Sequence, residues 1–331
     1  MIKILVFKYI NLLKYLLKNK FNFKSITYYP IKADIEPTTG CNFKCTMCQV
    51  SSPGFIKRNM SLETFKKIID QNPQFIKIKI QGLGEPFVNK EIFEMIKYAN
   101  DKFIKVNTVT NGSLLNSDNI KKILAVKINE LSISIDGASK KVFESIRLGS
   151  DFDVVIKNVG NLTNNRNKNI KKIQSLTLIQ KKNLFELEDI IKLCKRLKLD
   201  EIQFQYLLTS WGKDEWKTVN NEQQIDNENK FFDLIQIYRR KYQDNNFKIG
   251  VVTKNKFTEY NKCNYPWETP YFSTQGFVVP CCMIANPEVV NFGNITNMNF
   301  YSIWNNKQYD DLRLSINNHK LKDYCKNCYN I

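Results

Sequence analysis

Short runs of β-branched and apolar residues alternate with helical patterns along most of the chain. Each such run ends in a polar or glycine-containing loop, so we predict strands at Ile31 to Glu36, Phe75 to Gln81, Ile104 to Val109, Leu131 to Ile135, Gln174 to Ile179 and Glu201 to Leu207. Between them, apolar positions recur every three or four residues, which predicts helices from Ser61 to Asn72, Glu91 to Ala99, Ser117 to Val126, Leu184 to Leu197 and within Glu222 to Tyr242. This alternation is typical of a parallel βα series.

Six βα units predict an α/β fold, an incomplete (β/α)6 TIM-type barrel. In such barrels the chemistry lies in the loops at the carboxyl ends of the strands. From about Lys254 the pattern changes to short segments rich in Asn, Pro, Gly and aromatic residues around several cysteines. We therefore expect three parts: a leader over residues 1–30, a barrel over 31–253 and a small metal-stapled domain over 254–331.

The leader is apolar and basic at once. Lys3, Lys8 and Lys14 interrupt its apolar residues, so it has neither the ~20-residue run of a spanning helix nor the cleavage site of a signal peptide. An amphipathic helix packed on the domain is the favoured interpretation, and a helix in peripheral contact with a membrane surface is the alternative. We expect a cytoplasmic protein.

Charge and cysteine content narrow the function classes. The 331 residues include 50 Lys and Arg against 32 Asp and Glu, a formal charge of +18. The excess is almost entirely scattered lysine, without an Arg-rich block or a stacking motif, so we do not expect a nucleic-acid partner. Nine cysteines in two main groups are too few for a disulfide scaffold and favour thiolate metal ligands in a reducing compartment.

The first cysteine group follows the first predicted strand directly. Cys41, Cys45 and Cys48 form a C-x3-C-x2-C loop, and three thiolates can hold three irons of a cubane cluster while one iron stays open to a small molecule. A structural zinc site would need a fourth ligand nearby, and the only histidine of the chain is His319.

The same loop, with Met47 before its last cysteine, resembles the signature of the radical S-adenosylmethionine (radical SAM) superfamily. The resemblance implies a 4Fe-4S cluster whose open iron is chelated by the methionine part of SAM. Reductive cleavage of SAM, with an electron from a donor such as flavodoxin or ferredoxin, would then give a 5'-deoxyadenosyl radical that abstracts hydrogen from a substrate.

Further loops resemble the superfamily's SAM-binding motifs. Gly82-Leu83-Gly84-Glu85-Pro86 is similar to its GGEP motif, Thr110-Asn111-Gly112 to its TNG turn, and the strand around Ser132 and Ser134 to the one that contacts the ribose. Taken alone, these strings are also compatible with an ordinary turn and a strand with one polar face, and Arg147 with a solvated helix end. The resemblance implies SAM contacts by Met47, Gly84, Glu85, Asn111, Ser132, Ser134 and Arg147; it assigns no catalytic residue.

The second cysteine group resembles the SPASM/twitch extension of radical SAM enzymes. Cys263-x2-Pro-Trp, Gly276-x4-Cys281 and Cys325-x2-Cys328 carry the likeness, which implies one auxiliary 4Fe-4S cluster held by Cys263, Cys281, Cys325 and Cys328. Cys282 competes with Cys281 for its ligand position, although the spacing favours Cys281. A structural zinc ribbon on the same thiolates is the alternative.

Two substrate classes fit this resemblance. The chain is short and shows no added peptide-binding domain, so our expectation is an oxidoreductase for a small sugar or cyclitol alcohol, with the auxiliary cluster as electron acceptor. The alternative is a peptide- or protein-modifying enzyme, such as an epimerase, a thioether-forming enzyme or a formylglycine-forming maturase.

Overall fold

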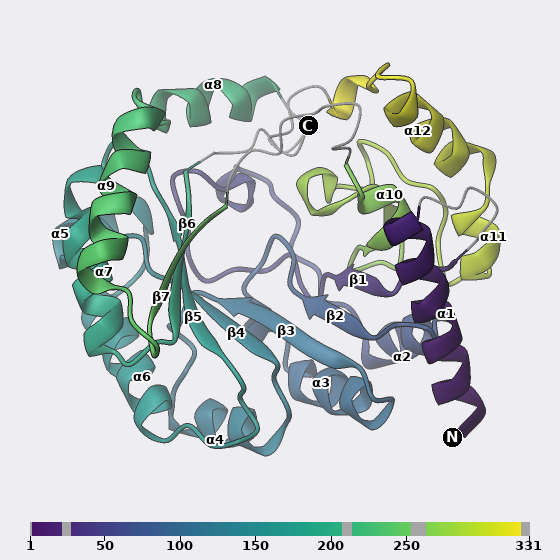
Figure 1. Cartoon of the computed structure of the whole chain (residues 1–331), viewed down its shortest axis with the longest axis horizontal. Coiled ribbons are helices and arrows are strands. Elements are labelled where there is room, and N and C mark those ends of the chain that lie inside the picture. Colours follow the sequence, from purple (N-terminus) through teal and green to yellow (C-terminus); the bar gives the residue numbers. More distant parts are fainter. Residues whose placement is uncertain (1, 22–27, 207–213, 253–262, 326–331) are drawn as a thin grey trace.

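A single sheet, open at both edges, organises the molecule. The computed structural model describes residues 2–21, 28–206, 214–252 and 263–325. Seven neighbouring strands run parallel (Figure 1): β1 (Lys32–Ile35), β2 (Lys77–Ile80), β3 (Lys105–Thr110), β4 (Glu130–Ser134), β5 (Ile173–Leu178), β6 (Glu201–Gln205) and β7 (Lys248–Val252). The predicted α/β class and the six predicted strands are confirmed. The seventh parallel strand, β7, was not predicted, because the apolar segment around Gly250 is short.

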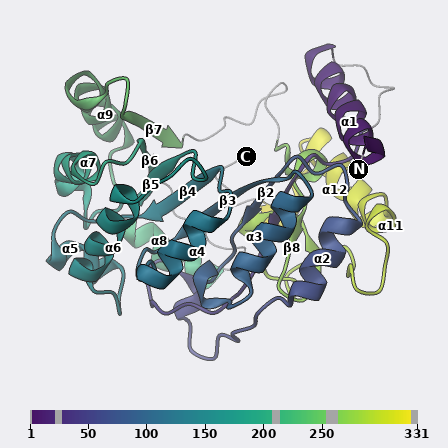
Figure 2. The ribbon, with the colours of Figure 1, turned by 90° about the horizontal axis from the view of Figure 1, so that it is seen from below.

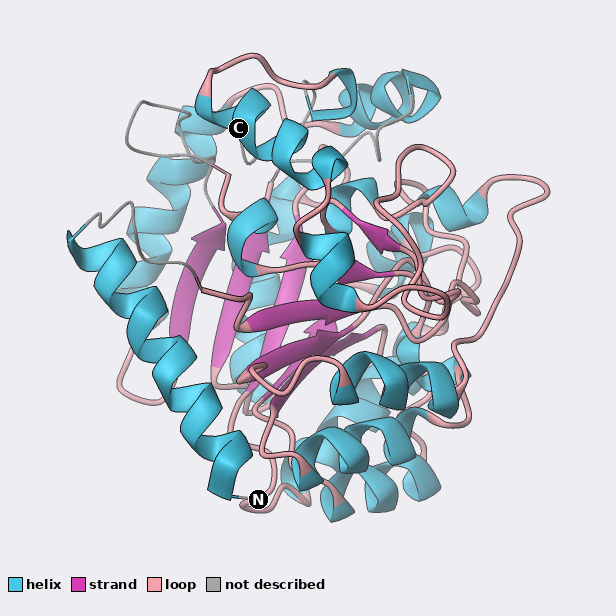
Figure 3. Cartoon of the chain, turned by 90° about the vertical axis from the view of Figure 1, so that its right-hand side faces the viewer, coloured by secondary structure: helices cyan, strands magenta, loops and turns pink. Residues whose placement is uncertain are grey.

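Helices cover the outer face of this curved sheet, as Figures 1 and 3 show. They are α2 (Leu62–Asp70), α3 (Ile92–Asp101), α4 (Ser117–Ala125), α5 (Lys140–Ile146), α6 (Phe152–Asn164), α7 (Leu187–Arg196) and α9 (Glu228–Tyr242). Helix α8 (Asp214–Gln223) lies beside the first cysteine loop instead, where Gln223 accepts a hydrogen bond from the Thr46 hydroxyl at 2.8 Å. Alternate strand residues such as Ile78, Ile133 and Ile202 are fully buried in the main apolar core.

The long helix expected within residues 222–242 is confirmed as α9, which begins at Glu228 and ends at Tyr242. Helix α8, which ends at Gln223, is a separate helix before it that the sequence pattern did not predict. The side chain of Asn227 accepts a hydrogen bond from the backbone N–H of Lys230 and so caps α9. Helices α5 and α6 lie in a stretch for which the sequence pattern gave no prediction.

The C-terminal segment continues the same sheet. It contains α10 (Tyr265–Glu268), β8 (Tyr271–Phe272), β9 (Val278–Val279), α11 (Phe300–Trp304) and α12 (Lys307–Asn317). Strand β8 pairs in parallel with β1, and β9 pairs antiparallel with β8. The cysteine-rich part is therefore hydrogen-bonded to the barrel through the strand that leads into the first cysteine loop. The expected boundary at residues 253/254 lies outside the described residues.

The leader forms the expected helix, α1 (Ile2–Phe21), on the outside of the molecule (Figure 2). Several of its apolar side chains face outward rather than toward the domain. Among the described helices, none combines the length and apolar character that crossing a bilayer requires.

Candidate functional site

A chamber of about 440 Å³ lies at the carboxyl ends of the strands. It is lined by residues of the loops and strand ends from β1 to β8, which is where the barrel rule places the chemistry. The predicted site residues that line it are Cys41, Cys45, Met47, Cys48, Gly84, Glu85, Asn111, Ser134 and Arg147.

The three thiols of the first group form one wall of the chamber. Burial raises the pKa of each thiol, that of Cys48 to about 12, so the thiolates need a cationic partner to form. Among the described residues, no three His, Cys, Asp or Glu side chains surround a single ion position. Three thiols in one loop form the donor set of a cubane, which takes one thiolate at each of three irons.

Backbone hydrogen bonds and one ion pair hold the cysteine loop. The N–H groups of Lys44 and Thr46 donate to the carbonyls of Leu148 and Ile146, at 2.8 and 3.0 Å. Between these carbonyls, Arg147 places Nη1 3.9 Å from Cys45 Sγ and Nη2 2.7 Å from a carboxylate oxygen of the fully buried Asp136. The guanidinium therefore brings positive charge beside the thiols, while Asp136 positions it.

The Gly82–Pro86 loop packs directly against the cysteine loop. Gly84 N–H donates to Thr38 O and Glu85 N–H donates to Gly40 O, at 3.2 and 2.9 Å. A Cβ on Gly84 would lie 2.3 Å from the carbonyl oxygen of Gly40. Only glycine allows this approach, which brings Glu85 to the chamber wall.

Glu36 joins three parts of the site, and the sequence analysis did not single it out. Its carboxylate accepts from Leu83 N–H at 3.0 Å, Tyr271 hydroxyl at 3.0 Å and Thr274 N–H at 3.2 Å. Burial raises the pKa of Glu36 to about 7. The available signal was a carboxylate at the end of an apolar strand, directly before the cysteine loop.

Glu85 is buried, with 3% of its surface exposed, and burial raises its pKa to about 7. Its oxygens accept from Thr110 Oγ1 at 2.8 Å, Asn111 N–H at 2.7 Å and Phe87 N–H at 3.3 Å. A carboxylate has about four lone-pair sites, so one remains for a donor in the chamber. This arrangement is compatible with a bound ammonium group.

The other predicted SAM contacts divide into two sets. Asn111 lines the chamber, but its amide also ties the strand-end turn to the cysteine loop, since Nδ2 donates to Asn42 Oδ1 at 3.0 Å. Met47 and Ser134 line the chamber. Ser132 does not: it lies two positions earlier on β4, where its hydroxyl accepts from Gln174 Nε2 at 2.9 Å.

The described cysteines of the second group face different surroundings. Burial and, to a lesser degree, the charges of Cys325 and Cys281 raise the pKa of the Tyr324 hydroxyl, and Cys263 lies two positions before the first residue of α10. Cys282 instead lines the chamber, 3.2 Å from the Tyr265 hydroxyl. The choice of Cys281 as the auxiliary ligand stays a prediction, and Cys328 lies outside the described residues.

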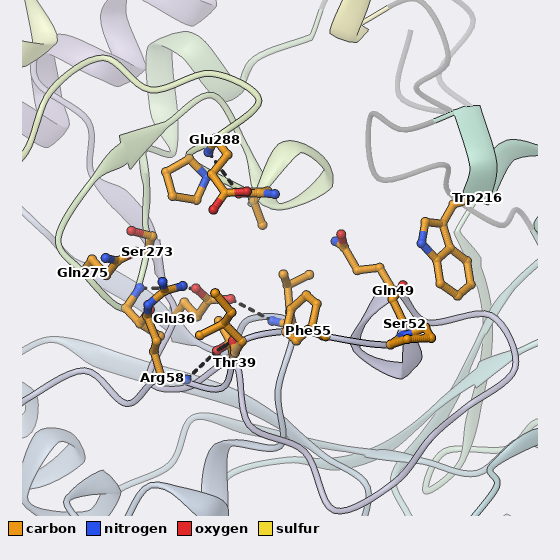
Figure 4. A pocket seen from close by; sticks show the side chains of 18 of the residues that line it. Glu36, Thr39, Gln49, Ser52, Phe55, Arg58, Trp216, Ser273, Gln275 and Glu288 are labelled. Atoms are coloured by element: carbon orange, nitrogen blue, oxygen red, sulfur yellow. Dashed lines mark hydrogen bonds between the residues drawn. The ribbon is translucent and has the colours of Figure 1, made fainter.

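A second cavity, an open groove of about 520 Å³, adjoins the chamber (Figure 4). Leu83 and no other described residue lines both. Phe55 and Trp216 give the groove apolar walls, while Arg58 and Glu288 add charge. The amide of Gln49, with 2% of the residue exposed, points into the space between Phe55 and Trp216, and neither amide atom has a hydrogen-bond partner in the part of the chain that the structure describes.

Comparison with known proteins gives matches for both cysteine regions. Residues 35–194 match the family model of the radical SAM superfamily, and residues 263–329 match an iron-sulfur cluster-binding domain named SPASM. The AdoMet-dependent heme synthase of Methanosarcina barkeri is 25% identical over 82% of this chain and 81% of its own length.

Two further proteins resemble the chain over most of its length. The antilisterial bacteriocin subtilosin biosynthesis protein AlbA of Bacillus subtilis is 25% identical over 91% of this chain and 67% of its own. The crystal structure of Streptococcus suis SuiB bound to precursor peptide SuiA has a TM-score of 0.70 at 17% identity, over 91% of this chain and 70% of that one. Together, the two matches assign residues 35–194 to the radical SAM superfamily and residues 263–329 to the SPASM iron-sulfur domains, and with them an enzyme that uses SAM, a 4Fe-4S cluster and an auxiliary iron-sulfur cluster.

Proposed function

We propose that this enzyme modifies a peptide that lies in the groove and presents one residue to the chamber. The observation that carries the proposal is the groove together with the buried amide of Gln49, which has no hydrogen-bond partner among the described residues. Leaving a buried polar group without a partner costs about 1–3 kcal/mol, so a ligand that reaches this amide and supplies both a donor and an acceptor would be stabilised. A peptide unit offers this pair in the spacing that a glutamine amide matches.

The size and position of the groove support an extended substrate. A sugar or cyclitol would fit within the chamber and would leave the groove without use. A peptide can occupy both cavities, because they meet at Leu83. The apolar walls formed by Phe55 and Trp216 suit a side chain of such a peptide.

The relatives support the same substrate class. AlbA, which aligns with 91% of this chain, is named for the biosynthesis of a bacteriocin. These likenesses favour the peptide alternative over the sugar or cyclitol expected first from the sequence.

The chain's own residues supply binding, orientation and exclusion of water. When bound, SAM and the cluster supply the 5'-deoxyadenosyl radical, after an external one-electron donor has provided the electron. We infer that Glu85 holds the SAM ammonium and that Arg147, fixed by Asp136, compensates the charge of the thiolates. Gln49 would fix the peptide backbone so that one hydrogen faces the radical.

A tetrapyrrole is the second candidate substrate, favoured by the heme synthase relative. Such a substrate carries several carboxylates. Lys79 and Arg147 are the cationic side chains among the described lining of the chamber, and Arg147 already pairs with Asp136. This charge arrangement ranks the peptide first.

Deuterium transfer tests the proposal. Reconstituted enzyme is incubated with SAM, dithionite and separate peptide, sugar and tetrapyrrole fractions from deuterated cells, and 5'-deoxyadenosine is analysed by mass spectrometry. We expect label from the peptide fraction, reduced about tenfold or more in Gln49→Leu, which keeps the size but removes the amide. Gln275→Ala, at the exposed rim of the same groove, is the control and should retain transfer. Label arriving only from sugars or only from tetrapyrroles contradicts the proposal.

A further inference from the structure

Helix α1 turns polar side chains toward the molecule and apolar ones away from it. Lys8 and Asn11 are 5% and 3% exposed. Tyr9, Leu13 and Leu16 are 68%, 56% and 51% exposed, and Val6 and Ile10 are each 50% exposed. This is the reverse of the usual arrangement for a surface helix of a globular protein.

Specific polar contacts fix the helix in this rotation. Lys8 Nζ donates to Lys102 O at 2.7 Å, and burial lowers the Lys8 pKa to about 8. Asn11 exchanges two hydrogen bonds of 2.9 Å with the backbone of Tyr29. Rolling the helix to bury its apolar side would break these contacts and expose the polar atoms, so the outward apolar side is a built feature.

The outward residues form a continuous stripe. Val6, Tyr9, Ile10, Leu13 and Leu16 follow the spacing of one helical face and span an arc of roughly 120°. Single exposed apolar residues are common, but a continuous stripe of this length marks an interaction surface.

The charge of the helix indicates the partner. Between Ile2 and Phe21 there are five lysines and no aspartate or glutamate. By helical spacing, Lys14 falls beside the apolar stripe, and its exposed side chain flanks Ile10. An apolar stripe with an aromatic residue and basic flanks is the composition of helices that lie in the interface of anionic membranes.

We propose that α1 docks this enzyme on an anionic membrane surface, with the helix lying in the headgroup region. Pairing with a second copy of the chain would bring together two helices that contain lysines and no acidic residue, so that occupant is disfavoured by like charge. The proposal does not depend on the substrate of the enzyme.

Vesicle flotation of the reconstituted full chain tests this docking. We expect binding to phosphatidylcholine vesicles that contain phosphatidylglycerol, little binding to pure phosphatidylcholine, and release at high salt. Leu13→Glu should weaken binding at least roughly tenfold, because it removes apolar burial and adds a repelled charge. Leu314→Glu on α12 is the matched control, since Leu314 is also 56% exposed.

Each other outcome overturns the proposal. Absence of binding, equal binding to both vesicle types, or equal loss in Leu13→Glu and Leu314→Glu would exclude α1 as an anionic membrane anchor. A lipid-independent dimer that Leu13→Glu dissociates in light-scattering chromatography would assign the stripe to a second copy of the chain. Iron content and melting temperature of both variants verify that they are folded.

Discussion

At the scale of single residues, the site depends on buried charges whose partners the fold supplies. Arg147 is held by Asp136, and Glu85 is held by Thr110 and the backbone of Asn111. Removing one partner of such a pair leaves the other charge buried without compensation, which lowers the stability of the folded protein. Conservative substitutions are therefore the informative ones.

Glu85→Gln should weaken SAM binding by about 1.5–3 kcal/mol, the value of a hydrogen bond to a charged group, without loss of iron. The physical reason is that the amide keeps the shape of the carboxylate but loses its charge toward the SAM ammonium. Equilibrium dialysis with labelled SAM on the anaerobically reconstituted protein measures the change. Glu130→Gln, at the amino end of β4 and outside the chamber lining, is the control. Unchanged affinity in Glu85→Gln would reduce Gly84-Glu85-Pro86 to a structural turn.

At the scale of elements, the site is assembled where two loops come into contact. The Gly82–Pro86 loop reaches the cysteine loop because Gly84 has no side chain. The contact distance leaves no room for even one carbon atom.

Gly84→Ala should therefore separate the two loops, lower iron retention at the first cluster and reduce SAM binding at least about tenfold, since neither loop is a flexible side chain that could yield. Iron and SAM titrations measure both losses. Gly160→Ala provides the comparison. Gly160 lies on helix α6, where a Cβ would have its nearest neighbour, Leu197 Cδ2, at 3.9 Å, and where alanine favours the helix. Equal behaviour of the two variants would contradict the close-contact argument.

Sequence pattern predicts those features that depend on local periodicity or on a motif. The strands β1 to β6 and the three-thiol loop are of this kind, because alternation and cysteine spacing are visible within a few residues. Strand β8 pairs with β1, and Glu36 accepts a hydrogen bond from Tyr271; both contacts join residues more than 200 positions apart. No local sequence pattern predicts such contacts. The partner of Ser132 was missed for the same reason, since Gln174 reaches it from a neighbouring strand.

At the scale of the whole molecule, the protein should carry two separate iron sites. Replacing Cys41, Cys45 and Cys48 together by Ala should halve a total of about eight irons and abolish SAM cleavage. Replacing Cys325 and Cys328 by Ala should remove the other half while SAM cleavage remains measurable. Iron and sulfide analysis with Mössbauer spectroscopy measures both, and Cys194→Ala is the control because this buried thiol lies on α7. Unchanged iron in the triple variant would contradict the cluster assignment.

The strand pairing between β8 and β1 has a consequence for how the protein unfolds. Because β8 is hydrogen-bonded to the strand that enters the first cysteine loop, and Glu36 is bonded to the turn after β8, the SPASM region cannot detach without disrupting the barrel edge beside the active site. Barrel edge and SPASM region thus behave as one cooperative unit. The relative position of the two cysteine groups is set by sheet geometry rather than by a flexible linker, so thermal fluctuations at this edge change the distance between them little.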